Sequence, residues 1–513
     1  MILPSDFVDI NDRTSLKRLI TAFLILLTLA VFLQVRGFEF LIYDDPILVT
    51  ENVHVKHGFT WEGILWSFSS GALIHGHTFD YWHPVTYLSH MLDVELFGMN
   101  PAWHHLMNLF FHVMNVILLF GFLTRLTRAP WRSAFVAAVF AVHPLQISSV
   151  VWISERKDVM SVFFALLAFQ SYQFYVMQKS RTRFLSVWFF VLLSLMSKPL
   201  LVGAPFILLM MDVWPLERFK SQKAWALFWE KWPFWLLSAF ICILTVLHSS
   251  PHFLTPVYAA PVYFLLYLWN LFFPPYIPIY PWQVSTYAAW ITFAAFAAVG
   301  SLCLIAFQAK RKYPTIFFGW YWYLFTLAPM IFLKFENRYT YLPMVGIAMI
   351  FVWRIAQIIQ PVKRQKLIGF ILFLVCVIPL AIRTHSEAAV WRNNQTLFET
   401  TLSFSPGVNQ IHYLYATDLA QKKKIDEALP HYLAVMKSVP DAKTYDALTE
   451  RLLNYLDADD IDERIAFFER AVRIKPDYTA GYQGLCDLYT GRNATDKADH
   501  FCGIAENPAD SRG

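Results

Sequence analysis

The chain has 513 residues, of which 57% are hydrophobic, 18% are aromatic and only 15% are charged. Soluble domains carry about 25% charged residues, so this composition excludes an ordinary soluble protein and indicates a multi-pass membrane protein. The net charge of +5 does not indicate nucleic-acid binding, because the basic residues stand in short clusters between apolar segments, which is a topology signal.

The first apolar segment, residues 19–35, is long enough to cross a bilayer as a helix. Three basic residues precede it, which predicts a cytoplasmic N-terminus. The segment lacks a small-residue cleavage site, so we interpret it as a retained anchor. Asp44 and Asp45 follow it and are therefore expected at the outer membrane face. As part of Asp-Asp-Pro, the pair also fits ordinary turn chemistry.

Hydropathy predicts about eleven transmembrane helices in an all-α bundle. After the first, the expected ranges are 103–124, 133–150, 159–178, 184–197, 200–213, 233–248, 285–308, 315–332, 341–360 and 367–382. Residues 257–273 are also apolar, and we expect them to form a re-entrant or interfacial helix. With this count the basic clusters fall on the cytoplasmic side, and the odd number of spans places the C-terminal tail outside.

From about residue 387 the composition becomes that of a soluble helical domain. We therefore expect a transmembrane domain over residues 1–386 and an extracytoplasmic domain over residues 387–513. Prolines recur in this tail about every 34 residues, which is the period of tetratricopeptide helix hairpins. Such a solenoid binds peptides or proteins on its concave face.

Two finer expectations concern the tail. The repeat pattern places Ala428, Tyr432 and Val435 at packing positions between helices. Cys486 and Cys502 could form a disulfide if the tail is extracytoplasmic, because disulfides persist in oxidising compartments.

Ionisable residues gather at the predicted outer ends of the spans, where they are costly and are functional candidates by default. Besides the acidic pair, the candidates are His83, His105, His143, Arg156, Lys157, Asp158, Lys198, Arg338 and Tyr341. Paired acids and several fixed cations at one face of an apolar bundle form the pattern that indicates function.

Structural alternatives exist for several of these residues. His105 could serve only as an interhelical hydrogen-bond partner. Arg156 and Lys198 could form structural ion pairs with Asp158 or Glu155. The loop histidines around His83, at positions 75 and 77, could bind a structural metal, but loop histidines without cysteine or helical spacing rarely do, and no metal is assigned.

This combination suits the transfer of a sugar from a lipid phosphate. Arg and Lys bind the phosphate and stabilise the charge that develops on it as it leaves. A loop carboxylate accepts the proton of an acceptor hydroxyl as this hydroxyl attacks the anomeric carbon, and a single displacement inverts that centre. We find neither a P-loop nor a dinucleotide glycine motif, which favours a lipid-borne donor over a nucleotide.

The chain resembles bacterial relatives of the transmembrane and tetratricopeptide repeat-containing (TMTC-like) O-mannosyltransferases of the GT-C glycosyltransferase superfamily. The matching runs are YDDPILVTEN, YWHPVTYLSHMLDVELFGMNPAWHHLMNLFFH, HPLQISSVVWISERKDVM, LMSKPLLVGAPFILLMMDVWPLER, ENRYTYLPMVG and the tail. The resemblance implies a GT-C bundle that uses a polyprenyl-phosphate sugar, with catalysis in the first outer loop, in the bacterial inner membrane with a periplasmic tail. It implies no other cofactor.

The resemblance also implies residue roles. Asp44 and Asp45 match the acidic pair, one of them the general base, and Arg156 and Lys198 match basic positions assigned to the donor phosphate. Further candidates for donor binding are His83, His143, Arg338, Lys157, Asp158, His105 and Tyr341. One departure is Ser148, where the relatives usually carry a glutamate. If that glutamate binds sugar or orients the acceptor, the substrate differs or the activity is impaired.

The function expected from these observations is O-glycosylation of an extracytoplasmic protein that the tail recruits. One alternative is a non-catalytic, membrane-anchored tetratricopeptide scaffold for an envelope assembly system. A second alternative, a transporter of lipid-linked sugars, is disfavoured because transporters place charges near the bilayer midplane and often show inverted repeats. The identity of the sugar is not transferred from the animal relatives.

Overall fold

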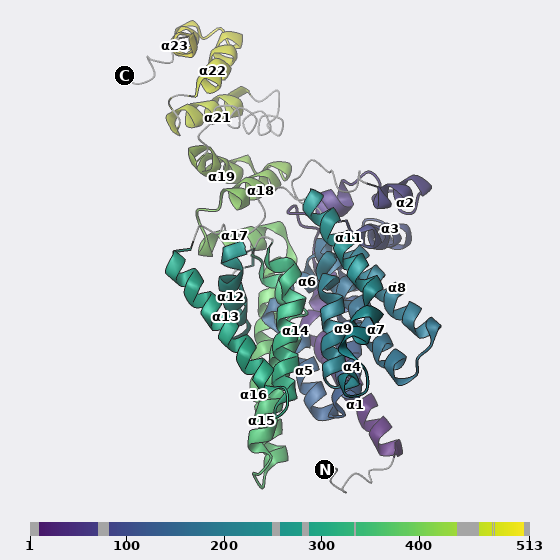
Figure 1. The fold of residues 1–513 in the computed structure, drawn as a ribbon. Helices are drawn as coiled ribbons and strands as arrows, with labels where there is room; N and C mark the ends of the chain where they lie inside the picture. Colours follow the sequence, from purple (N-terminus) through teal and green to yellow (C-terminus); the bar gives the residue numbers. More distant parts are fainter. Residues whose placement is uncertain are drawn as a thin grey trace. The chain divides into compact units, whose positions relative to one another are not determined.

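The computed structural model describes residues 10–69, 82–248, 257–276, 278–279, 287–332, 335–438, 461–474, 476 and 478–506. All regular elements in these ranges are helical (Figure 1). The chain divides into two compact units, Met1–Arg392 and Asn393–Gly513. The expected all-α class is therefore confirmed.

The first unit is a bundle of helices joined by short breaks and turns. Its longer helices are α1 (Ile10–Phe32), α3 (Pro84–Phe97), α4 (Pro101–Thr127), α5 (Pro130–Val142), α7 (Arg156–Met177), α8 (Arg181–Ser197), α9 (Ala204–Val213), α11 (Trp232–His248), α12 (Ala260–Phe272), α13 (Ala289–Ala309), α14 (Pro314–Ile331), α15 (Met344–Ile359) and α16 (Gln365–Ala388). Within this unit α4 packs against α5 and α7, and α7 packs against α8 (Figure 1).

Several of these helices meet the requirements for crossing a membrane. Among the described residues, five are long and apolar enough, and the number rises to seven if each of two bent pairs counts as one span. The five segments are Thr14–Gly37, Pro101–Thr127, Ile153–Met177, Ala289–Ala309 and Gln365–Arg392. The other predicted spans form helices that fall short of this length or hydropathy, as α9 and α15 do. The multi-pass expectation is confirmed, whereas these criteria alone do not reach a count of eleven.

Prolines set two breaks that shape the interior of the bundle. A proline disfavours helical geometry in the residue before it, and both His143 and Lys198 precede one. His143 has φ −76° and ψ 136°, and Lys198 has φ −161° and ψ 141°. The first break bends the pair Pro130–Val142 and Pro144–Val151 by 58°. The second separates α8 from η6 (Pro199–Gly203). Both broken ends carry candidate residues.

One close helix contact depends on two glycines. A Cβ atom at Gly319 of α14 would collide with the backbone carbonyl of Gly346 in α15, and the reverse is also true. These helices therefore pack backbone against backbone. This packing holds the start of α15 in place, and α15 follows directly on the turn that carries Arg338 and Tyr341.

The second unit consists of consecutive helices that pack on one another. These are α17 (Asn394–Phe404), α18 (Asn409–Gln421), α19 (Ile425–Ser438), α21 (Ile461–Ile474), α22 (Thr479–Gly491) and α23 (Thr495–Glu506). The predicted packing positions Ala428, Tyr432 and Val435 are all buried. Cys486 and Cys502 form a disulfide between α22 and α23. The tetratricopeptide assignment itself stays a prediction.

Candidate functional site

The two adjacent acids that follow the first span have different surroundings. Asp45 is completely buried, and both of its carboxylate oxygens accept hydrogen bonds. Oδ2 accepts the backbone N–H of Leu41 at 2.8 Å, whereas Oδ1 accepts the backbone N–H of Ser154 at 3.1 Å and its hydroxyl at 2.5 Å. Burial raises the pKa of Asp45 to about 6, although these hydrogen bonds oppose the shift. Asp45 therefore joins the first loop to the segment that precedes α7.

Asp44 is only half-buried, and the structure gives its carboxylate no hydrogen bond among the described residues. Burial raises the pKa of Asp44 to about 7, while the positive charges of Lys157 and Arg338 oppose this shift and the negative charge of Glu155 adds to it. A carboxylate with a pKa near neutrality and free oxygens can accept a proton at physiological pH.

A buried ionic cluster lies next to the acidic pair. Lys198 places its Nζ atom 2.5 Å from Asp158 Oδ1 and 3.4 Å from Glu155 Oε2. Glu155 Oε1 also lies 3.3 Å from Lys157 Nζ and 3.0 Å from a guanidinium nitrogen of Arg338. Glu155 therefore binds three cations at once. Removing any one of the three leaves a buried carboxylate less compensated.

Arg338 is the cation of this cluster that reaches an open space. Its guanidinium also pairs with Glu336 and lies 5.0 Å from the ring centre of Trp152, a distance at which a cation is attracted to the ring face. Burial opposes the charged form of Arg338, but the charges of Glu155 and Glu336 together raise its pKa above the ordinary value. Arg338 is therefore a fixed cation.

A pocket opens beside this cluster and contains about 780 Å³ of unfilled space, part of it open to solvent. Its wall combines aromatic and polar side chains, which include Tyr43, Ser148, Trp152, Glu336, Arg338 and Trp391. Tyr43 packs edge-on against Trp152 at 5.2 Å, and Trp152 lies 5.7 Å from Trp391. The pocket therefore has aromatic faces beside a fixed cation, and Asp44 follows the wall residue Tyr43 in the chain.

Arg156 lies in a different cluster from Lys198, although both were expected to bind one phosphate. It is completely buried, and its guanidinium donates to Asn108 Oδ1, to Ser89 Oγ at 2.9 Å, to Asp93 Oδ2 at 2.6 Å and to the carbonyl of His104 at 2.8 Å. Arg156 therefore forms a buried ion pair with Asp93, whereas the ion-pair alternative named Asp158 or Glu155.

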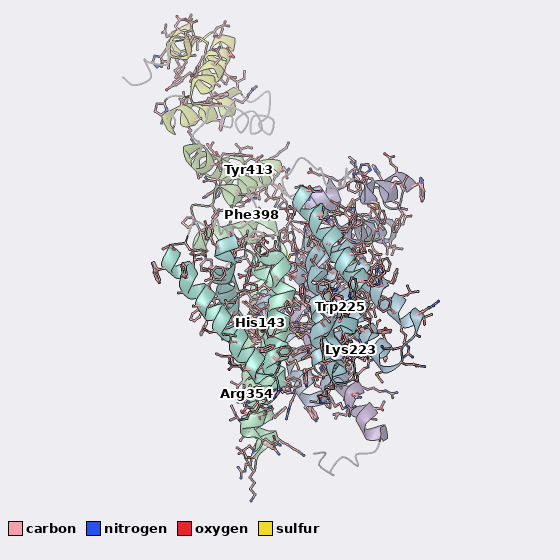
Figure 2. All side chains as sticks on the ribbon, viewed as in Figure 1. His143, Lys223, Trp225, Arg354, Phe398 and Tyr413 are labelled. Atoms are coloured by element: carbon pink, nitrogen blue, oxygen red, sulfur yellow. A yellow bond between two sulfur atoms is a disulfide. The ribbon has the colours of Figure 1, made fainter. Side chains whose placement is uncertain are left out.

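Two of the candidate histidines bond to backbone carbonyls. His143 lies inside the first unit (Figure 2), where its Nε2 is 3.0 Å from the carbonyl of Leu271 and its Nδ1 accepts the backbone N–H of Leu145. His105 Nε2 lies 3.2 Å from the carbonyl of Glu39. Both rings therefore link segments that are distant in sequence.

Tyr341 and His83 also make contacts within the bundle. The Tyr341 hydroxyl lies 2.6 Å from His112 Nδ1 and accepts a hydrogen bond from Asn115 at 3.2 Å. His83 immediately precedes α3 and stacks on Tyr87, with ring centres 4.5 Å apart. His75 and His77 lie outside the described residues.

The aromatic wall is the part of this site that sequence reasoning missed. Trp152 stands in the run VWISERKD, directly before the ionic cluster, and this position was the available signal. Trp391 and Val390 belong to the first unit and line the pocket, although the tail was expected to begin at residue 387. Ser148, the expected departure, also lines the pocket.

The fold and this site define a helical multi-pass membrane protein with a pocket beside a buried ionic cluster. The chain is 24% identical to human protein O-mannosyl-transferase TMTC1 over an alignment that covers 78% of this chain and 53% of that protein. It is 22% identical to human protein O-mannosyl-transferase TMTC4, with 76% of this chain and 62% of that protein covered. It is also 28% identical to Drosophila melanogaster protein O-mannosyl-transferase Tmtc1 over 36% of this chain and 21% of that protein.

The chain is thus a distant relative of the TMTC proteins, as the resemblance predicted. It spans a little more than half the length of the two human relatives that it matches over most of its own length. No family model and no solved structure matches it.

Proposed function

We propose that this chain is an integral-membrane glycosyltransferase of the GT-C type. It moves a sugar from a polyprenyl-phosphate carrier to a hydroxyl group of a protein acceptor, with inversion at the anomeric carbon. The names of its relatives support protein O-glycosylation, because they are protein O-mannosyl-transferases and align with most of this chain. The pocket supports a transferase over a passive scaffold, because a scaffold does not require a free carboxylate beside a fixed cation.

The observation that carries the proposal is the state of Asp44. Its carboxylate has no hydrogen bond among the described residues, its pKa is about 7, and its neighbour Tyr43 lines the pocket. Asp45 has the opposite state, with both oxygens occupied by protein donors. Asp44 is therefore the general base, and Asp45 positions it by fixing the turn.

Arg338 is the residue that contacts the donor phosphate. It is the cluster cation that lines the pocket, and its bonds to Glu155 and Glu336 hold the guanidinium in place. Lys198 is completely buried among carboxylates, so it acts on the phosphate only through Glu155 and is a positioning residue. Lys157 lies on Glu155 and also lowers the pKa of Asp44.

These roles give a single displacement. The acceptor oxygen forms a bond to the anomeric carbon, and the bond from this carbon to the phosphate oxygen breaks. The electron pair of the broken bond goes to the phosphate, whose developing charge Arg338 stabilises. The acceptor proton goes to Asp44. The sugar ring packs against the aromatic wall formed by Trp152 and Trp391.

The remaining parts of the proposal concern place and acceptor. We assign the pocket and the second unit to the extracytoplasmic side of a bacterial inner membrane. The disulfide between Cys486 and Cys502 supports this side for the second unit, because the cytosol keeps most thiols reduced. The second unit binds the protein acceptor.

Transfer by the purified full-length chain tests the proposal. The chain is incubated in detergent with a panel of polyprenyl-phosphate sugars and extracts of exported proteins, and intact-mass analysis follows the acceptors. We expect one donor to add the mass of a single sugar in the wild type and not in Asp44→Asn. If exported proteins from cells with and without the gene have identical masses, and no donor is consumed, the proposal is wrong.

A further inference from the structure

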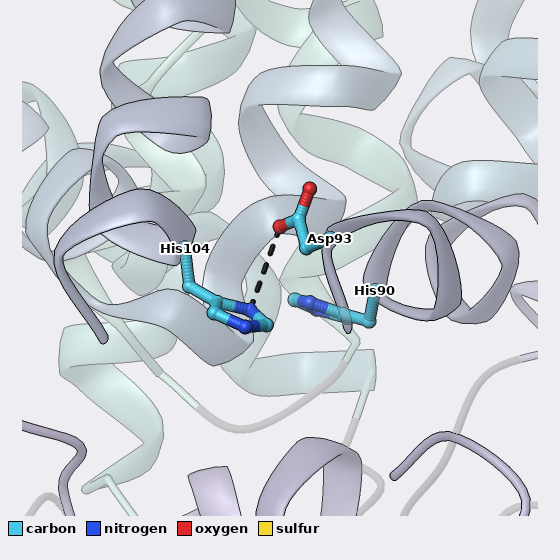
Figure 3. A group of neighbouring side chains, drawn as sticks. All are labelled: His90, Asp93 and His104. Carbon is cyan, nitrogen blue, oxygen red and sulfur yellow. Dashed lines mark ion pairs between the residues drawn. The ribbon is translucent and has the colours of Figure 1, made fainter. Parts of the chain in front are cut away.

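A group of three buried side chains lies outside the pocket. His90 and Asp93 stand three residues apart in α3, and His104 lies in the first turns of α4 (Figure 3). Each offers one ligand atom, and these atoms lie within 4.8 Å of one another. All three residues are completely buried. Two histidines and one carboxylate, with a fourth position open, form a common ligand set for zinc.

The ring of His104 faces the carboxylate with the wrong nitrogen for a hydrogen bond. Its Nε2 lies 3.0 Å from the carbonyl of Gly98, and a carbonyl only accepts, so Nε2 carries the proton in the neutral ring. The bare Nδ1 then points its lone pair at Asp93 Oδ2, 3.5 Å away. Two lone pairs at this distance repel each other. A cation between them converts this repulsion into two coordinate bonds.

The other two residues also present unused atoms. Neither ring nitrogen of His90 and neither His104 Nδ1 nor Asp93 Oδ1 has a hydrogen-bond partner among the described residues. Buried polar atoms are almost always satisfied, so several orphans at one place indicate a missing ligand.

The surroundings supply the supports that metal ligands require. The bond from His104 Nε2 to the Gly98 carbonyl orients the ring, as second-shell carbonyls do in many metal sites. Arg156 donates to Asp93 Oδ2 and also to the backbone carbonyl of His104. It fixes the carboxylate while Oδ1 remains without a partner.

We propose that His90, Asp93 and His104 bind one divalent transition-metal cation of the Zn²⁺ class. The ion has a structural role, because it joins α3 to the first turns of α4 and because Arg156 connects it to the segment that carries Glu155. A tetrahedral zinc ion holds its ligands about 3.4 Å apart, so small side-chain rotations complete the site. The site differs from the metal alternative at the loop histidines and does not depend on the proposed transferase activity.

Zinc binding to the purified full-length chain tests this site. The protein is stripped with EDTA in detergent, incubated with ZnCl₂, desalted and analysed for zinc and protein content. We expect about one Zn²⁺ per chain in the wild type. We expect most of it to be lost in His90→Gln, Asp93→Asn and His104→Gln. Zinc should also raise the melting temperature of the wild type, and EDTA should reverse the rise.

Two controls separate this site from other histidines. His57 is exposed, and its Nδ1 bonds to the carbonyl of Val53, so His57→Gln should retain the zinc. The double variant His75→Gln/His77→Gln should retain it as well. The zinc-dependent change in melting temperature is measured on the wild type. It therefore still tests the site if one of the ligand variants does not fold. A wild type that takes up no zinc, or uptake that persists in all three ligand variants, overturns the proposal.

Discussion

The backbone N–H of Ser154 donates a hydrogen bond to Asp45 Oδ1 at 3.1 Å, although the two residues are 109 positions apart in the chain. This bond distinguishes Asp45 from the neighbouring Asp44. It holds the turn after the first span against the segment before α7. Asp44 makes no side-chain hydrogen bond among the described residues, and in the proposed mechanism it is the acid that meets the acceptor.

The first prediction concerns the two acids. Asp45→Ala removes the acceptor for the buried donors of Leu41 and Ser154, and each unsatisfied donor costs about 1–3 kcal/mol. We expect a clear fall in the melting temperature of this variant.

The pKa of Asp44 is higher in the folded protein than in the unfolded chain. At a pH above the unfolded pKa, the charged form of Asp44 therefore opposes folding. Asp44→Asn should therefore keep or slightly raise the melting temperature at pH 8. Thermal unfolding in detergent measures both changes, and an equal loss in both variants contradicts this division.

The second prediction concerns pH. Asp44 accepts a proton only when it is ionised, and its pKa is about 7. We expect kcat/KM for the donor to rise with pH and to reach half its maximum near pH 7. Lys157 lowers the pKa of Asp44, so Lys157→Gln should move this midpoint to higher pH. A midpoint that stays fixed in Lys157→Gln argues that another group titrates.

The third prediction concerns Arg338. Arg338→Gln removes the cation that faces the pocket and should reduce kcat by about 10²- to 10³-fold, as the loss of one electrostatic donor to a transition state does. Arg338→Lys should recover only part of the activity, because a lysine cannot bind Glu155 and Glu336 in the same fork geometry. Arg354, whose side chain bonds to Gln357, is the matched control, and Arg354→Gln should keep full activity. If Arg338→Gln and Arg354→Gln reduced kcat equally, the assignment of Arg338 to the donor phosphate would be wrong.

The fourth prediction concerns the buried pair of Lys198 and Asp158. Lys198→Met leaves Asp158 and Glu155 with less compensation in the interior and should destabilise the first unit by about 3–5 kcal/mol. Adding Asp158→Asn to the same chain should restore part of this loss, because it removes one uncompensated charge. Thermal unfolding of the single and double variants measures the coupling. Additive losses would show that the two side chains do not stabilise each other.

The sequence predicted the helical membrane class, because this class depends on a pattern along one dimension. Hydropathy marked the spans, and polar residues at span ends marked the level of the ionic cluster. For the run Glu155-Arg156-Lys157-Asp158, the sequence pattern did not predict which side chain points to which neighbouring helix. Successive helical residues turn by about 100°, so Glu155 and Asp158 both face Lys198, whereas Arg156 points away from it, to Asp93 in α3 and to His104 in α4.

The same limit applies to the neighbouring acids and histidines. Asp44 and Asp45 differ only in which way a tight turn directs each side chain, and this direction depends on Ser154, more than a hundred residues later. The sequence analysis named His105 as a candidate and not its neighbour His104. The ligand set with His104 forms only when α3 packs on α4, and a pattern read within one helix does not contain that contact.

The last prediction concerns the disulfide of the second unit. Cys486 and Cys502 are 16 residues apart, and closing a loop of this size stabilises a folded domain by about 3 kcal/mol. Cys486→Ser/Cys502→Ser should therefore unfold the second unit at lower temperature, with no change in the membrane unit.

The bond also reports the compartment, because it persists only on the oxidising side of the membrane. In intact cells, blocking free thiols before lysis and labelling again after reduction should show this pair oxidised. Cys242, a free cysteine within the apolar helix α11, is the control and should react as a free thiol once the protein is denatured in SDS. If Cys486 and Cys502 were found reduced in vivo, the second unit would lie in the cytosol. This location would contradict the proposal that the second unit binds an exported protein acceptor.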